Sequence, residues 1–501
     1  MTAAVDTRTG QAVVLVGAAA ALGVLLTVGL AVVGPAAALL PIALVACWWL
    51  FWHPVATLAT LVTTTVLIEG QPGVWPVALD RWYGSLGPTP LHPPDVLVLL
   101  LLGWVVYERL TSGRPGPGIG PFTLPMALMA VALAFGLVTG YLGPSNKIDL
   151  VGSARVVGLL LVVPYVTAEV LRRRGNPRRA VSFVVVLVVI RAAVGLVAVL
   201  TDHTSGAAGS TGVAASLSAE ASTFYEPTMN FLMVVVLLGV LVAVVRRVPL
   251  PRWLYLAAPV LVVTLALSYR RSFWIALVLG VVLVLLVASG QRGRPWLVLG
   301  AAAVGLALYV AISAGGATDT TNPVLYRAES LSPSKLASST GDRYRLDEQR
   351  NVLAEIRAHP LTGLGLGVPW TIRYALSENH IGGQLYTHVT PLWFWLKLGP
   401  LGFVAYLWVW ATAIRTAYGV WRQDRDRRIR VTALALGAAF VGLMVAELTG
   451  PFTGIDVRIT LTVAVAFGWL VAARAGLQDE ERDPATETDD RRRRDYALTA
   501  R

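Results

Sequence analysis

The sequence predicts an all-α polytopic membrane protein, with about 14 transmembrane helices (roughly 12–14) and one long extracytoplasmic loop. Hydrophobic residues make up 55% of the 501 residues and charged residues only 14%, a balance outside the range of soluble proteins. Many apolar runs approach the ~20 residues that a helix needs to cross a bilayer. Backbone polar groups in lipid must be satisfied within the segment, so we expect helices and not strands.

Taken in order, the apolar runs predict transmembrane helices over 12–33, 35–52, 54–68, 94–110, 122–140, 151–170, 180–200, 227–245, 253–269, 272–289, 296–314, 391–419, 431–448 and 457–474. The first run is too long for the apolar part of a signal peptide, so we interpret it as a retained helix. The chain then divides into a transmembrane bundle at 1–314, an extracytoplasmic loop at 315–390, transmembrane helices at 391–474 and a charged, disordered cytoplasmic tail at 475–501.

The distribution of arginine orients these helices. With the N-terminus inside and alternating crossings, the short arginine-rich loops all fall on the cytoplasmic side, as the positive-inside rule requires; they lie at 172–179, 246–252, 292–294 and 422–430. The loop 201–226 contains no lysine or arginine and falls outside, together with 315–390. The predicted location is therefore the cytoplasmic membrane, with the polar loop, and any active site on it, on the extracytoplasmic face.

Composition and motifs exclude several function classes. A net charge of +12 often indicates nucleic-acid binding, but these arginines lie between membrane spans, so we predict the lipid bilayer as a partner and no nucleic acid. Cys47 is the only cysteine, which excludes disulfides and cysteine-based zinc sites. The histidines lack metal-ligand spacing, and Asp424-Arg425-Asp426 is best explained as a solvated charge cluster. We predict no metal and no cofactor.

The long loop carries the largest group of polar residues outside the predicted spans. Residues Arg345 to Arg357 predict a short amphipathic helix that ends before Pro360, with Leu346, Val352, Leu353 and Ile356 facing the bundle or lipid. The glycine-rich run 363–367 lacks the context of a nucleotide fold and is more typical of close backbone packing.

Three arginines outside this loop are also candidate functional residues. Arg270 and Arg271 interrupt two apolar runs on the predicted outer side, against the charge rule, although snorkelling to lipid headgroups is an ordinary explanation. Arg155 lies within an apolar run near the outer end of its helix. Because an ionisable residue inside a membrane span is costly, it is by default a candidate for function, here in holding an anionic headgroup.

Three motifs in order resemble the O-antigen ligase and polymerase family of bacterial membrane glycosyltransferases, over roughly 220–450. His388 and Val389 are followed, after nine further residues, by Gly399-Pro400-Leu401-Gly402, similar to the family's His-led motif that ends in Gly-x-x-Gly. The segment from Arg345 to His359-Pro360-Leu361-Thr362-Gly363 resembles its Arg-led helix. Ser268-Tyr269-Arg270-Arg271-Ser272-Phe273-Trp274 resembles its Ser-Arg-x-x-Trp turn. Val389 and Lys397 depart from the usual amide and acidic residue, which leaves the substrate open.

The resemblance implies a GT-C-like protein that transfers a glycan from an undecaprenyl-pyrophosphate-linked oligosaccharide to a hydroxyl of a glycan, lipid or protein acceptor. Arginine matches the oxygens of the pyrophosphate leaving group, and a neutral histidine suits proton removal from the acceptor. One displacement would invert the anomeric centre, without a metal. The expected catalytic residues are His388, Arg271 and Arg345. The expected substrate-binding residues are Arg270, Arg343, Arg155, His380 and Tyr344.

Several alternatives stay open at this point. His380 is the rival base, Arg270 could replace Arg271, and Arg343 could replace Arg345. A polysaccharide or lipid-linked oligosaccharide transporter, either a flippase or an exporter, is the rival function; it should show repeated halves, which we do not find. Within the family, the sequence does not separate ligation from polymerisation or protein glycosylation. Its compositional bias favours polymerisation or attachment of a cell-surface polysaccharide.

Overall fold

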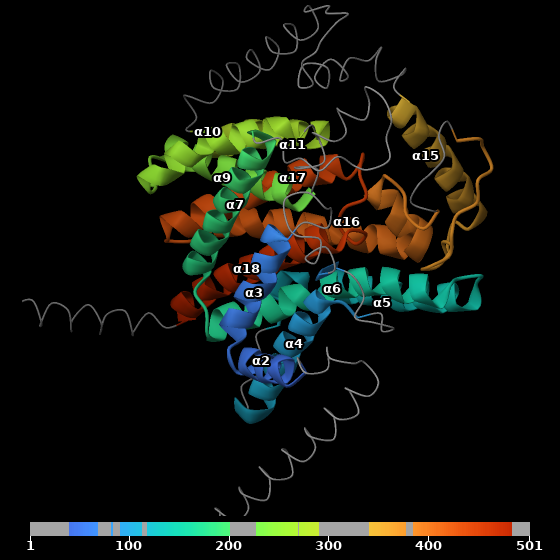
Figure 1. The fold of residues 1–501 in the computed structure, drawn as a ribbon, viewed down its shortest axis with the longest axis horizontal. Helices are drawn as coiled ribbons and strands as arrows, with labels where there is room; N and C mark the ends of the chain where they lie inside the picture. The colour runs from blue at the N-terminus through green and yellow to red at the C-terminus, as the bar shows by residue number, and fades with distance from the viewer. Residues whose placement is uncertain are drawn as a thin grey trace, which may run out of the picture.

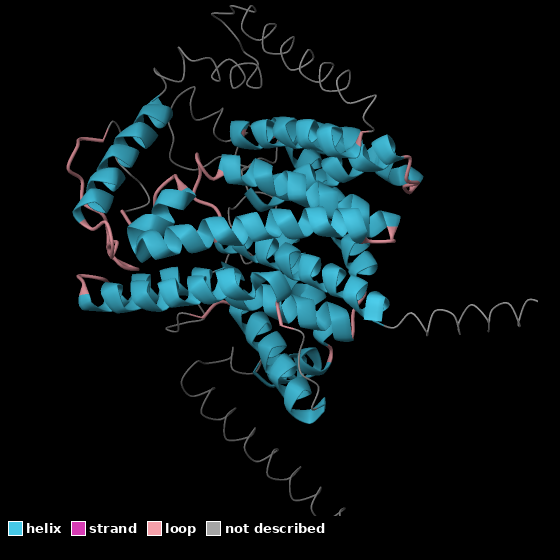
Figure 2. Cartoon of the chain, turned by 180° about the vertical axis from the view of Figure 1, so that it is seen from behind, coloured by secondary structure: helices cyan, strands magenta, loops and turns pink. Residues whose placement is uncertain are grey.

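A computed structural model describes residues 40–68, 82–83, 91–112, 118–200, 227–268, 270–289, 340–376 and 384–482. The described part is helical and contains no strand, which confirms the all-α prediction (Figure 2). Its elements are α2 (Leu40–Trp52), α3 (Pro54–Leu67), α4 (Pro93–Ser112), η3 (Gly120–Phe122), α5 (Thr123–Leu142), α6 (Lys147–Arg173), α7 (Pro177–Leu200), α9 (Pro227–Arg246), α10 (Arg252–Leu267), α11 (Arg271–Ala288), α15 (Thr340–Ala358), α16 (Thr390–Gln423), α17 (Arg427–Ala446) and α18 (Val457–Arg482).

Within these residues, eight helices are long and apolar enough to cross a membrane, or up to nine if a bent pair is one span. The predicted spans 35–52 and 54–68 form that pair, α2 and α3, which are bent by 113°. The break falls at His53 because proline disfavours a helical residue before it. Helix α4 carries three charged residues and α10 has only 16 residues. Runs 12–33 and 296–314 lie outside the described residues.

Helix α16 runs through the bundle and positions the other elements. It packs against α17 on one side and against α5 on another, while α6 and α18 lie side by side over most of their lengths (Figure 1). Helix α18 continues past the predicted boundary at residue 474 to Arg482. The remaining residues of the predicted tail lie outside the described part.

The glycine-rich run after α15 packs directly against the bundle. Gly365 has φ +88°, and a Cβ there would collide with the backbone of α5 at Gly140. The neighbouring Leu366 N–H donates to the carbonyl of Gly136 in α5 at 3.0 Å. Gly399, with φ +68°, breaks α16 where the backbone of Leu361 approaches it. The prediction of close backbone packing is confirmed.

Helix α15 stands across the end of α16 in both views (Figures 1 and 2). It begins at Thr340, five residues before Arg345. Val352 and Ile356 are buried against Trp370 and Leu396, so contact with the bundle is confirmed. Leu346, by contrast, is 54% exposed and lies outside this buried cluster. The buried face also contains polar residues; they are Glu348, Asn351 and Glu355.

One end of the bundle gathers arginines that are matched by carboxylates, and we call it the arginine end. It comprises the C-terminus of α4, the α6–α7 turn and the α16–α17 turn. The Glu169 side chain is 1% exposed and accepts hydrogen bonds from Arg109 at 2.8 Å and Arg173 at 2.9 Å. Arg178 forms an ion pair with Asp426 across the two turns. These pairs neutralise a carboxylate that would otherwise be buried without compensation.

Candidate active site

His388 lies at the opposite end of the bundle, two residues before α16 begins at Thr390. Its backbone N–H donates to the Glu348 carboxylate at 2.9 Å, and its Nδ1 lies 3.1 Å from Glu348 Oε2 and 3.2 Å from Oε1. The Glu348 side chain is fully buried, whereas 21% of the His388 side chain is exposed. The carboxylate therefore holds one ring nitrogen from within the protein, while part of the imidazole remains accessible. We call this region the histidine end.

Two tyrosine rings complete the walls around His388. The Tyr344 ring, from the start of α15, meets the imidazole edge-on at a centroid distance of 5.9 Å. Tyr386 meets it at 5.7 Å and a steep angle. Tyr344 is buried, and its ring packs against His388. Together with Glu348, these rings restrict the orientation of the imidazole.

The position of α15 relative to His388 is fixed by its polar buried face. The side-chain oxygen Oδ1 of Asn351 accepts hydrogen bonds from the backbone N–H groups of Arg373 at 2.6 Å and Tyr374 at 2.7 Å. Glu355 accepts from the Arg373 guanidinium at 3.1 Å. The Trp370 indole N–H donates to the carbonyl of Tyr386 at 3.0 Å. The bonds from Asn351 and Glu355 connect α15 to Arg373 and Tyr374, and the Trp370 bond connects that segment to the residues just before His388, so together they hold Glu348 at the histidine.

The loop between α17 and α18 braces the start of α16 from the other side. The Thr390 N–H donates to the Glu447 carbonyl at 2.9 Å, and its hydroxyl accepts from the Phe452 N–H at 2.9 Å. The Glu447 carboxylate is buried and accepts from the Thr453 N–H at 3.1 Å and from the Tyr406 hydroxyl. Burial raises the pKa of Glu447 to about 7, and its hydrogen bonds act in the opposite direction.

Arg271 opens α11, next to the same loop. Phe273, two residues further along, packs its ring against Phe452 at a centroid distance of 5.6 Å. Because Phe452 is bonded to Thr390, a continuous set of contacts leads from the first turn of α11 to the segment that carries His388. Arg270 and Arg271 are both partly exposed there.

The arginines of α15 differ in their surroundings. Arg345 is partly buried and lies one turn before Glu348 on the same helix, a spacing that brings side chains together. Arg343 is exposed. Both belong to the helix whose buried face holds His388, and Arg345 is the closer of the two to that face.

Arg155 does not join this group. Arg155 forms an ion pair with Asp95 of α4 at 2.8 Å, and its side chain is 15% exposed. Its place in an apolar helix is therefore explained by a buried partner, an interaction that the sequence analysis did not foresee. His380, the rival base, lies outside the described residues.

Sequence reasoning missed the two acidic residues at the histidine end. Glu348 follows Tyr344 by four positions and precedes Val352 by four, so it shares their helix face. That spacing was the available signal. It was overlooked because the predicted face included Leu346 and Leu353, which do not share the face of Glu348. Glu447 directly follows an apolar run and offered no comparable pattern.

This arrangement has the parts of a proton-accepting site. A buried carboxylate on Nδ1 fixes the tautomer in which Nδ1 carries the proton and Nε2 is the acceptor. It also stabilises the imidazolium that forms when Nε2 takes a proton. Guanidinium groups from α11 and α15 supply positive charge at the same end of the bundle. The chemistry that suits such a group is deprotonation of a hydroxyl beside an anionic leaving group.

One family model matches the part of the chain that carries most of these residues. Residues 256–407 match the family model described as O-antigen ligase. The match spans the first turn of α11, α15 and the start of α16, and so includes Arg271, Arg345 and His388. No curated protein matches the sequence.

Proposed function

Residues 256–407 belong to the O-antigen ligase family of membrane glycosyltransferases, which ligate or polymerise lipid-linked glycans, and from this premise we propose a specific reaction. The protein transfers a glycan from an undecaprenyl-pyrophosphate-linked donor to an acceptor hydroxyl at the outer face of the cytoplasmic membrane. The product is a cell-surface polysaccharide, lengthened or attached. The reaction needs no metal and inverts the anomeric centre.

His388 acts as the general base. Nε2 takes the proton from the acceptor hydroxyl as its oxygen attacks the anomeric carbon. The bond from that carbon to the pyrophosphate oxygen breaks, and its electron pair leaves with the pyrophosphate. Glu348 stabilises the imidazolium that results, because its carboxylate lies 3.1 Å from Nδ1. This contact between a buried carboxylate and a partly exposed histidine is the observation that carries the proposal.

Arg271 and Arg345 bind the pyrophosphate. A guanidinium presents two parallel N–H groups to phosphate oxygens and stays protonated at any physiological pH. Charge accumulates on the leaving group as the glycosidic bond breaks, so cations fixed beside it stabilise the transition state more than the ground state. The position of Arg345 beside Glu348 favours it over Arg343. Arg270 assists Arg271 from the same turn.

The test is a reconstituted transfer assay. Purified protein in detergent is given a lipid-linked oligosaccharide and an acceptor glycan, with no nucleotide sugar and with a metal chelator. We expect a new glycosidic linkage of inverted configuration, detected by mass spectrometry and NMR. Absence of any new linkage would contradict the proposal. Movement of intact donor across a proteoliposome membrane, especially if it depends on a transmembrane gradient, would favour the transporter alternative.

A further inference from the structure

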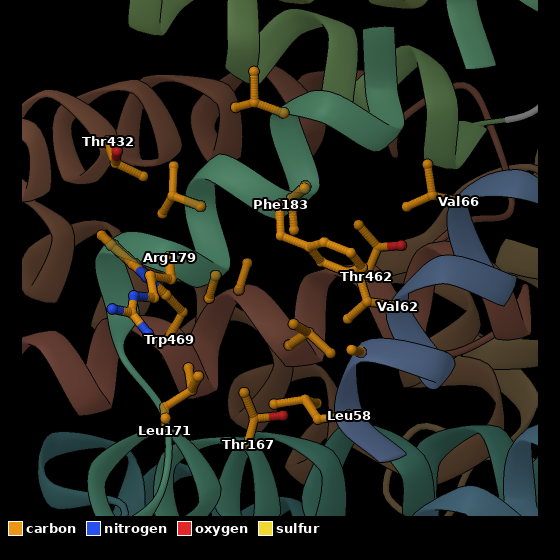
Figure 3. Close-up of a pocket in the computed structure, with 18 of the residues that line it drawn as sticks. Leu58, Val62, Val66, Thr167, Leu171, Arg179, Phe183, Thr432, Thr462 and Trp469 are labelled. Atoms are coloured by element: carbon orange, nitrogen blue, oxygen red, sulfur yellow. The ribbon is translucent and has the colours of Figure 1, made fainter. Parts of the chain in front are cut away.

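A large cavity lies away from the histidine end, among α3, α7, α9, α17 and α18 (Figure 3). Its volume is about 590 Å³, and most of its lining is aliphatic. Leu58 and Val62 of α3 face Phe183 of α7 across it, and Trp469 of α18 closes one side. None of the candidate site residues that the structure describes lines it. An apolar cavity of this kind between membrane helices is filled by hydrocarbon more readily than by water.

The lining changes character at the arginine end. There the α6–α7 turn contributes Arg174, Asn176 and Arg179 to the wall. Both arginines are exposed, and 58% of the Arg174 side chain is accessible. Arg174 makes one long contact, at 3.6 Å, with Glu108. Within the described residues Arg179 forms no ion pair, unlike its neighbour Arg178. The cavity is therefore apolar along its length and cationic at one mouth.

A hydroxyl group lies deeper in the same cavity. Thr167 of α6 lines the wall, has no exposed surface, and its Oγ1 has no hydrogen-bond partner among the described residues. It precedes Arg174 by seven positions, which is about 10 Å along a helix axis. Since Thr167 has no exposed surface, its hydroxyl is not open to a ligand, and the arginines supply the polar contacts of the cavity.

We propose that this cavity binds an anionic phospholipid of the bilayer. Arg174 and Arg179 hold the phosphate, and one acyl chain occupies the aliphatic slot between α3, α7 and α18. Lipid chains are as apolar as the slot, so the acyl chain gains by filling a void while the guanidinium–phosphate contact provides selectivity. Basic pockets between membrane helices bind anionic headgroups in this way. The proposal does not depend on the glycosyltransferase reaction.

The experiment measures phospholipid retained by the full chain. Delipidated protein is incubated with vesicles of phosphatidylglycerol or of phosphatidylcholine, repurified in detergent, and its bound lipid is quantified by mass spectrometry. The double variant Arg174→Gln/Arg179→Gln removes the cationic mouth. Arg252→Gln is the matched control, because Arg252 is exposed in the first turn of α10 and does not line the cavity. Val62→Phe fills the slot without changing charge.

We expect wild-type and Arg252→Gln to retain phosphatidylglycerol in preference to phosphatidylcholine. The double variant should retain about tenfold less of it. Val62→Phe should also lose retention while it elutes as wild type in gel filtration. Equal retention of both lipids by wild type, or unchanged retention by the two cavity variants, would overturn the proposal. A photoreactive residue introduced at position 183 gives a further test. Cross-linking from it to residues 1–39 of the same chain, instead of to lipid, would also overturn the proposal.

Discussion

The two ends of the bundle both bury carboxylates, but they compensate them differently. At the arginine end, Glu169 is held by two guanidiniums, which carry a permanent positive charge. At the histidine end, Glu348 is held by an imidazole and a backbone N–H, and Glu447 by a hydroxyl and a backbone N–H. Permanent ion pairs suit a structural role. Donors that can exchange protons suit chemistry, and this difference identifies which end to perturb.

The largest effect is expected from His388→Ala. Loss of a general base typically costs about 10²–10⁴ in rate, so glycan transfer should fall to background while the protein still inserts and purifies. His359→Ala is the control, because His359 is exposed just beyond the end of α15. The measurement is the initial rate of glycan transfer for wild type and both variants. Wild-type product from His388→Ala would move the base elsewhere, with His380 the next candidate.

Arg271→Lys should be nearly as damaging. A lysine keeps the charge but not the planar pair of donors, so we expect a loss of about 10²–10³ in kcat. Arg252→Lys makes the same exchange in the first turn of α10, outside the candidate site, and should leave kcat unchanged. If the two variants behave alike, Arg271 has no special role and the snorkelling explanation gains support. Arg270→Lys and Arg345→Lys then identify which guanidinium carries the effect.

Glu348→Gln tests the pairing that defines the histidine end. Glutamine preserves size and a hydrogen-bond acceptor but removes the negative charge, so kcat should fall about 10- to 100-fold with KM for the donor unchanged. The adjacent Asp347, whose carboxylate lies 3.6 Å from Arg350, provides the control Asp347→Asn. A rise in KM with no change in kcat would point instead to a displaced α15.

Glu169→Ala applies the same logic to the arginine end. Removing one partner of a buried ion pair leaves charges uncompensated and costs up to about 3–5 kcal/mol of stability. The melting temperature in detergent should therefore fall, while the transfer rate per folded molecule stays at the wild-type value. A specific loss of kcat in correctly folded protein would show that the two ends are functionally coupled.

The smallest effect concerns Glu447 and pH. Burial raises its pKa from 4.5 to about 7, so between these values the folded protein keeps a proton that the unfolded chain has released. The stability contributed by this carboxyl is therefore present at low pH and declines as the pH rises through that window. Glu447→Gln cannot titrate and should flatten the decline. Melting temperatures measured between about pH 5 and about pH 8 provide the check. Parallel curves for both proteins would contradict it.

Local features of the sequence were sufficient for much of the helical architecture. Apolar runs of sufficient length predicted α5, α6, α7, α9, α11, α16, α17 and α18, because a helix in lipid depends only on its own residues. Pro360 ended α15 as expected, and the glycine run packed closely. The bend between α2 and α3 was missed, although Pro54 is visible in the sequence, because a proline permits a bend without fixing its angle.

Only some residues of the candidate site could be predicted from the sequence. His388, Arg271 and Arg345 were predicted as site residues through motif resemblance. Glu348 was not, because it lies 40 residues from His388 in the chain. Arg155 and Asp95 are 60 residues apart, so their ion pair could not be predicted from the sequence either. A buried charge is tolerated only beside a partner, and the partner comes from wherever the fold places it.

The sequence by itself thus determined that this is a helical membrane protein with an arginine-rich end and a polar histidine-bearing segment, in which residues 256–407 match the O-antigen ligase family. Those properties follow from composition, run length and motif order, which are local. Only the tertiary structure decided that Glu348 orients His388 and that Asp95 forms an ion pair with Arg155. It also decided that a cavity lies beside Arg179. Each depends on contacts between segments that are distant in the chain. A buried polar or charged group costs free energy unless it has a partner, so the folded arrangement of the segments determines which partner it has.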